Sequence, residues 1–279
     1  MTWQTVAKKD IKDSVRSRGL WGIIVIFLAL ILVLSFLLSP GGDGDETLLV
    51  SAGLSFFLGI LFFVPLAGLF ISIKSIVREK ESGSINLLLS LPHTRLDMLL
   101  GKFVGRAVVL TVAILAAFGP ASIYLLAVGS GSGVYPLFAL LISIIFFGLI
   151  FIGVGIGLSA LVNSETQALV AGVAIFFLLY LWVPILGQLG IDAPDIIARF
   201  WLVFMFFDFF LVLLSLTNGS IDSASIVRYD DIVVDEGFDT ITIPSQDIWL
   251  QHWFVFVILA IWIVVPLGVG YLRFKRQDL

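Results

Sequence analysis

Residues 107–164 read AVVLTVAILAAFGPASIYLLAVGSGSGVYPLFALLISIIFFGLIFIGVGIGLSALVNS, 58 positions without a charged side chain. A helix needs roughly 20 apolar residues to cross a bilayer core about 30 Å thick, so this stretch must contain two spans. We expect the break at Gly129–Gly133, because glycine adopts turn conformations at no steric cost. Pro136 then suits the first turn of the next helix. The stretch therefore predicts spans at about 107–128 and 134–162.

Four more runs have the length and apolar character of a span, namely 20–38, 48–73, 168–190 and 253–272. The whole chain of 279 residues is 59% apolar and 13% charged, with a mean hydropathy of +1.12. Soluble domains carry about 25% charged residues, so a soluble globular chain is excluded. With no cysteine, disulfides and thiolate metal sites are excluded too. The sequence predicts an all-α, polytopic membrane protein with six transmembrane helices.

The basic residues are distributed unevenly along the chain. Fourteen of the 16 precede span one, lie between spans two and three, or follow span six. Because basic residues concentrate on the cytoplasmic side, we expect both termini in the cytoplasm and the protein in the cell membrane. The outer regions then hold 13 acidic and two basic residues, a formal charge of −11. The cytoplasmic regions hold 14 basic and seven acidic residues, a charge of +7.

Residues 1–19 form an amphipathic pattern. One half of a helical wheel is apolar and the other is basic, the two sets being Trp3, Val6, Ala7, Ile11 and Val15 against Lys8, Lys9, Lys12 and Arg16. Such a helix lies in the membrane interface and is attracted to anionic lipid. Two interpretations remain open: generic anchoring to lipid, or an elbow helix that bends into span one.

The cytoplasmic segment 74–106, KSIVREKESGSINLLLSLPHTRLDMLLGKFVGR, is too long for a tight turn and too apolar for a solvated loop. We therefore expect it to contact a partner surface. Gly83 interrupts the charged extension of span two, Ser84 is placed to cap a short leucine-rich helix, and Pro92 ends that helix. Thr94 and Asp97 have the spacing of a capping box at the start of the helix that becomes span three. The segment predicts a helix, a short crossing helix and a second helix.

At these residues the chain resembles the ABC-2 type permeases, the membrane subunits of ATP-binding-cassette transporters. The resemblance is carried by residues 78–84 (REKESGS), 87–92 (LLLSLP), Arg95 and 100–102 (LGK). It implies that the short helix is a coupling helix, which inserts into a groove of a separate ATPase subunit. Six spans, an amphipathic amino-terminal helix and an outer insertion before the last span agree with this family. Within this family, the chain also resembles the subfamily associated with nitrous-oxide-reductase maturation.

The resemblance implies an interface with the ATPase subunit. Its candidate residues are Glu79, Glu81, Gly83, Ser84, Leu87, Leu88, Pro92 and Arg95. Two alternatives stay open: the leucines lie on the membrane surface, and the two glutamates are neutralised by Arg78 and Lys80 on a solvated helix face. The implied partners are the ATPase subunit, a second permease copy or homologue, and membrane lipid, without nucleic acid.

The outer insertion, 191–252, contains an apolar run at about 200–216. A seventh span there would place the basic carboxyl-terminal tail outside, so we expect a re-entrant or interfacial helix. Asp208 lies inside this run, where a mid-bilayer charge costs about 2.5–3.5 kcal/mol, so it should face water or protein. Its role is either an outer gate or a polar stripe on an interfacial helix. The acidic loop 217–247 lacks the spacing of a calcium loop and is expected to be a solvated surface.

No GxxxxGK[ST] motif occurs, so the chain itself is not expected to be an enzyme or to hydrolyse ATP. No catalytic, cofactor-binding or metal-binding residues are expected, and three methionines and two separated histidines make a poor path for a soft metal. The prediction is a permease subunit of an ABC exporter. The alternatives are a stand-alone secondary transporter, which should carry charged residues at the midplane, and a membrane-embedded enzyme.

Pro65, Pro120, Pro184 and Pro266 lie within spans and serve either conformational change or static packing.

Overall fold

A computed structural model describes residues 3–15, 21–22, 25–26, 29, 60–83, 94–128, 134–191, 199–218 and 253–276. All regular structure in these ranges is helical. The helices are α1 (Trp3–Val15), α4 (Val77–Glu81), α6 (Arg95–Val128), α7 (Val134–Leu161), α8 (Glu165–Gln188), α10 (Leu202–Asn218) and α11 (Phe254–Lys275). A further helix covers residues 60–72 and is separated from α4 by a turn at 73–76.

Five helices of the described part are long and apolar enough to cross a membrane: Ile60–Glu81, Arg95–Gly119, Phe138–Leu161, Glu165–Gln188 and Phe254–Lys275. They support the prediction of a polytopic membrane protein, and the described residues contain helices as their regular structure. Several predicted features lie outside the described residues: most of span one at 20–38, the start of span two, the coupling helix at 84–92, the glycine break at 129–133 and the outer loop 219–252.

Helix α6 begins well before the apolar run that it contains. Thr94 and Asp97 form the predicted capping box, with the Asp97 N–H donating to Thr94 Oγ1 at 3.0 Å and the Thr94 N–H to Asp97 Oδ2 at 3.2 Å. The helix then continues for 34 residues, which corresponds to about 50 Å at 1.5 Å per residue. Since the bilayer core is about 30 Å thick, its first turns extend beyond the hydrocarbon.

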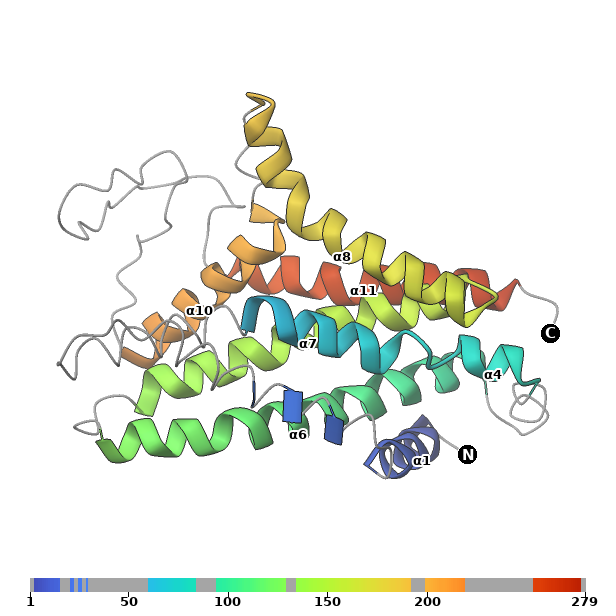
Figure 1. The fold of residues 1–279 in the computed structure, drawn as a ribbon, viewed down its shortest axis with the longest axis horizontal. Helices are drawn as coiled ribbons and strands as arrows, with labels where there is room; N and C mark the ends of the chain where they lie inside the picture. Colours follow the sequence, from blue (N-terminus) through green and yellow to red (C-terminus); the bar gives the residue numbers. More distant parts are fainter. Residues whose placement is uncertain are drawn as a thin grey trace.

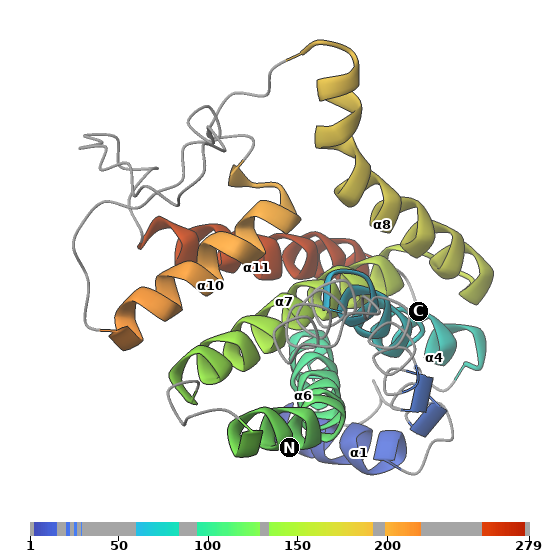
Figure 2. The same cartoon turned by 60° about the vertical axis from the view of Figure 1, so that its left-hand side comes forward.

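Helix α7 is the centre of the bundle. It packs against α6, α8, α10 and α11, and most extensively against α11. Figure 2 shows α7 between α6 on one side and α10 with α11 on the other. The α7–α11 crossing is close because Gly157 and Gly270 face each other: a Cβ at 270 would lie 2.8 Å from Gly157 Cα. Small residues allow such backbone approach between membrane helices.

Helix α10 covers Leu202–Asn218, in the region where the sequence predicts a re-entrant or interfacial helix. It packs on α7 and α11 through phenylalanines. The Phe206 ring lies 5.0 Å from that of Phe147, and the Phe209 ring lies 5.6 Å from that of Phe256. Its apolar side is therefore buried in protein.

Helix α8 leaves the bundle along its length. Its first turns lie beside α4, whereas its last turns point away from the other helices (Figures 1 and 2). The buried residues of α8 end at Tyr180. Beyond it, the apolar side chains of Leu181, Ile185 and Leu189 are exposed. Only the first two thirds of this helix are packed against the protein.

Candidate functional site

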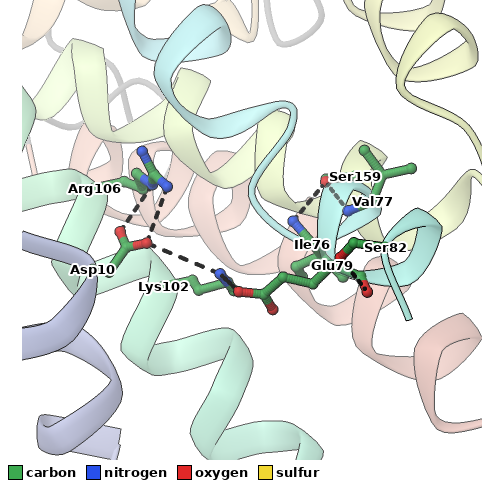
Figure 3. Close-up of polar contacts among 8 residues, drawn as sticks. All are labelled: Asp10, Ile76, Val77, Glu79, Ser82, Lys102, Arg106 and Ser159. Atoms are coloured by element: carbon green, nitrogen blue, oxygen red, sulfur yellow. Dashed lines mark hydrogen bonds and ion pairs between the residues drawn. The ribbon is translucent and has the colours of Figure 1, made fainter. Parts of the chain in front are cut away.

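The segment 84–93, predicted to contain the coupling helix, is preceded in the structure by α4 and followed by the start of α6. Helix α4 follows a break that hydropathy does not predict, because the chain turns at residues 73–76 before the helix resumes. Helix termini leave backbone N–H groups without intrahelical partners. At the start of α4, Ser159 of α7 supplies the missing acceptor: the N–H groups of Ile76 and Val77 donate to Ser159 Oγ at 3.0 and 2.9 Å (Figure 3). A serine of another helix thus caps α4.

Replacing Ser159 by alanine is expected to destabilise the protein by about 1–3 kcal/mol, because two buried N–H groups lose their acceptor. Ser143→Ala is the matched control. Ser143 is equally buried in the same helix, but its hydroxyl donates to Ala139 O one turn earlier, and its loss should be nearly neutral. Thermal unfolding of both variants in detergent tests this. Equal melting temperatures for the two variants would contradict the capping role.

Lys80 joins the other end of α4 to the same end of α7. Its Nζ donates to Ala160 O at 2.7 Å and to Val162 O at 3.2 Å. These carbonyls belong to the last turn of α7 and the residue after it, where carbonyls lack intrahelical donors. A positive charge there interacts favourably with the negative end of the helix dipole. Lys80 Nζ also lies 5.6 Å from the ring centre of Phe274 on α11. Helix α4 is therefore fixed to α7 at both of its ends.

Glu81 joins α4 to the start of α8. The backbone N–H of Glu165 donates to Glu81 Oε1 at 2.8 Å. The Glu165 carboxylate in turn lies 2.9 Å from Lys74 Nζ. A carboxylate is stabilised at a helix amino terminus by the free N–H groups and by the helix dipole. This contact adds α8 to the helices that hold α4.

Glu79 joins α4 to α6 and, through α6, to α1. Lys102 Nζ of α6 donates to Glu79 Oε1 at 2.7 Å and lies 3.9 Å from Asp10 Oδ1 of α1. Arg106 Nη2, one turn further along α6, donates to Asp10 Oδ1 at 3.0 Å. The side chains of Lys102 and Asp10 are less than a tenth exposed. These four residues form a buried ion cluster across three helices, seen in Figure 3.

Helix α1 reaches this ion cluster because glycines line its contact with α6. A Cβ at Gly101 would lie 2.6 Å from Val6 Cβ, and one at Gly105 would lie 2.9 Å from Asp10 Cβ. Ala7, Asp10 and Ser14, which recur at helical spacing, are buried against α6. The amphipathic helix predicted to lie on lipid therefore also packs closely on protein.

The far end of the segment is fixed to α11. Arg95, the first residue of α6, donates from Nη1 to Phe274 O and lies 5.3 Å from the ring centre of Phe274. The backbone carbonyl and the ring of one residue thus hold the same guanidinium group. Both ends of segment 84–93 are attached to the helix bundle.

The structure describes four of the eight predicted interface residues, and they lie next to the two ends of segment 84–93: Glu79, Glu81, Gly83 and Arg95. Gly83 has a φ of +69°, a left-handed conformation that favours glycine, and it follows the end of α4 as the sequence predicts. The other four, Ser84, Leu87, Leu88 and Pro92, lie outside the described residues. Both glutamates bind groups of this chain, on α6 and α8, which neither sequence alternative proposed.

Sequence reasoning missed the roles of Asp10, Lys102 and Ser159. Two signals were present: Asp10 is an acid within a basic helix, and Lys102 lies between Gly101 and Gly105, which mark a close helix contact. Ser159 gave no signal that distinguishes it from other serines in apolar helices.

Asp208, the predicted outer gate residue, faces protein. Arg199 donates from Nε and Nη2 to Asp208 Oδ2 at 2.9 and 2.8 Å, and both side chains are buried. The pairing explains how a carboxylate is accommodated among phenylalanines, since a buried charge requires a partner. Within the described ranges, no group of three or more His, Cys, Asp or Glu side chains is placed to hold a metal ion.

Taken together, ion pairs and capping hydrogen bonds fix the short helix α4 to α6, α7 and α8. Comparisons with known proteins identify the family of the chain and two relatives. The model of the family described as ABC-2 family transporter protein matches residues 4–279. A protein of Stutzerimonas stutzeri named probable ABC transporter permease protein NosY is 28% identical over 98% of this chain and 97% of its own. A protein of the same name from Pseudomonas aeruginosa is 34% identical over 44% of this chain and 45% of its own.

Proposed function

The chain belongs to the ABC-2 family of transporter proteins, and from this premise we propose that it is an exporter subunit driven by a separate ATPase through segment 84–93. The observation that carries the proposal is the attachment of both ends of this segment. Its start is held by Glu79, Lys80 and Glu81 on α6, α7 and α8. Its end is held by Arg95 on α11. A displacement of the segment would therefore move the whole bundle.

The proposed interface with the ATPase consists of the segment itself. Ser84, Leu87, Leu88 and Pro92 supply its contact surface, while Glu79, Glu81, Gly83 and Arg95 set its direction from the bundle. Because Glu79 and Glu81 already bind groups of this chain, their role in the proposal is to transmit force. ATP binding would close two ATPase subunits, and the two attached ends would convert that closure into rotation of the spans.

In the proposed topology the protein lies in the cytoplasmic membrane and has six spans. Both termini are on the cytoplasmic side. Two features support it. The described residues nearest the two termini lie toward the end of the bundle that carries α4 (Figure 1). The exposed lysines of α1, Lys8, Lys9 and Lys12, suit the anionic inner leaflet. The transport path is proposed to lie between this chain and a second copy or homologue, with Asp208 near its outer opening.

The test is affinity purification of the tagged chain in mild detergent, followed by identification of bound proteins. Wild type is expected to recover an ATPase with Walker motifs. Leu87→Asp together with Leu88→Asp should reduce that recovery at least tenfold, because charges enter an apolar contact. Leu87→Met with Leu88→Met is the matched control and should retain it.

Three outcomes separate the possibilities. Equal recovery by the aspartate variant would place the ATPase contact elsewhere. Loss in both double variants would indicate a fold defect rather than a contact. No ATPase with wild type, under conditions that keep a known transporter assembled, would favour a stand-alone secondary transporter and reject the proposal.

A further inference from the structure

Two of the prolines inside membrane helices, Pro65 and Pro184, each leave a backbone carbonyl without its usual donor. Proline has no N–H, so the carbonyl four residues earlier loses its intrahelical hydrogen bond. For Pro65 that carbonyl belongs to Leu61, and for Pro184 it belongs to Tyr180. In a membrane interior such groups must be satisfied by other protein groups.

Tyr180 connects both of these carbonyls. Its hydroxyl donates to Leu61 O, the carbonyl freed by Pro65. Its own carbonyl, freed by Pro184, accepts from Trp201 Nε1 at 3.2 Å. One residue of α8 therefore links the helix of residues 60–72 to the segment that leads into α10.

That segment is itself fixed to two further helices. Arg199 is paired with Asp208 of α10. Phe200 O accepts from Trp262 Nε1 of α11 at 3.2 Å. The chain of contacts from Leu61 through Tyr180 to Trp201 thus ends on helices that pack on α7.

Tyr180 is also the outermost buried residue of α8. It is 7% exposed and its ring stacks on Phe176 at 4.7 Å and on Phe62 at 5.7 Å. Nine residues later Leu189 is 67% exposed, and α8 has turned away from the bundle (Figure 1). Beyond Tyr180, no residue in the described part of α8 is fully buried.

We propose that Tyr180 is a latch that holds α8 against the helix of residues 60–72 at the end of the bundle opposite α4. With the latch closed, both proline-freed carbonyls have donors. Its release exposes the Leu61 carbonyl and frees the last turns of α8 to move outward, as an exporter requires on its outer side. This inference rests on the proposed function for its purpose, while the latch itself is testable on the chain alone.

The first measurement is a double-mutant cycle on the full chain in nanodiscs, read by thermal unfolding. Tyr180→Phe should lower the melting temperature by about 2–4 °C, since it removes one interhelical hydrogen bond. In the background of Pro65→Ala, the new N–H at residue 65 satisfies Leu61 O. There, Tyr180→Phe should change the melting temperature by less than about 1 °C. Equal losses in both backgrounds would overturn the proposal.

Tyr271→Phe on α11 is the control for the loss of a hydroxyl as such. Its hydroxyl has no hydrogen bond to the described residues, and the change should leave the melting temperature unaltered. Where Tyr180→Phe alone fails to fold for want of a donor to Leu61 O, the test is the double variant Tyr180→Phe with Pro65→Ala. This double variant should be recovered as folded protein, because the N–H of residue 65 supplies that donor. Failure of the double variant to fold would overturn the latch.

The second measurement separates a latch from a static staple. The chain has no cysteine, so Phe138→Cys and Leu189→Cys, at side chains 63% and 67% exposed on α7 and after α8, can carry spin labels. Tyr180→Phe should lengthen and broaden the distance distribution, and Pro65→Ala should not restore it, because the new N–H satisfies Leu61 O without joining α8 to the helix of residues 60–72. An unchanged distribution would reject the latch. Neither measurement involves an ATPase, so their failure is distinguishable from failure of the proposed function.

Discussion

Replacing Gly270 by leucine is expected to prevent the chain from accumulating as a folded membrane protein. Helices α7 and α11 form the most extensive contact of the bundle. At their crossing, a Cβ on residue 270 would lie 2.8 Å from Gly157 Cα and 2.9 Å from Gly157 O. These are backbone atoms and cannot move aside by a change of rotamer, so the helices would have to separate. Detergent extraction followed by size-exclusion chromatography measures the folded fraction.

The size of the effect should follow the size of the side chain. Gly270→Ala is expected to cost about 1–3 kcal/mol, the usual range for overpacking a close contact. Gly268 is the matched control, two residues earlier on α11, where a Cβ meets no atom within 4 Å. Gly268→Ala should be neutral or stabilising, since alanine favours helix by about 1 kcal/mol over glycine. Similar losses at both positions would mean that helix flexibility, and not the crossing, requires the glycine.

The sequence predicts the helices of this protein well because hydropathy alone selects them. The charge-free run 107–164 contains parts of α6 and all of α7, and the five candidate spans of the described part each overlap a predicted range. Which helix faces which is a different question. Since lipid and protein interior are equally apolar, a span carries no pattern that marks its buried side. The sequence therefore does not distinguish the central α7 from the partly detached α8.

Glycine and proline hold the information that hydropathy lacks, but only in pairs. Gly157 marks a close contact, yet nothing in the sequence assigns Gly270 as its partner. The same holds for Pro65 and Pro184: each predicts a carbonyl without a donor, but Tyr180 and Trp201 are identified as the donors only by the structure. The choice between conformational change and static packing for these prolines consequently depends on contacts that are distant in sequence.

The charged residues near segment 84–93 show what a count of charges leaves out. Counting basic residues requires only their side of the membrane, and Lys102 contributes to that count like any other lysine. Its burial between Glu79 and Asp10 depends on the approach of α1 to α6. The sequence predicts Glu79 at an interface with a partner subunit, and it gives no sign that the Glu79 carboxylate also binds Lys102 of the same chain.

Lys102→Met is expected to destabilise the protein by about 3–5 kcal/mol, the range for a buried ion pair that loses one partner. Methionine fills similar volume, so the loss is that of charge. Glu79 then loses the ammonium group that lies 2.7 Å from its carboxylate, while Asp10 retains Arg106. Helix α4 should loosen from α6, and hydrogen exchange at residues 77–83 should accelerate along with a lower melting temperature. Lys9→Met, at an exposed lysine of α1, is the control and should change neither.

The decisive comparison adds Glu79→Gln to Lys102→Met. If the cost of Lys102→Met comes from the loss of the positive charge beside the Glu79 carboxylate, neutralising that carboxylate removes much of the penalty. The double variant should then be no less stable than Lys102→Met alone, although Glu79→Gln by itself is destabilising. Additive losses would mean that the two side chains act independently. In that case α4 would be held only by its contacts with α7 and α8, and the Glu79–Lys102 pair would not hold it to α6.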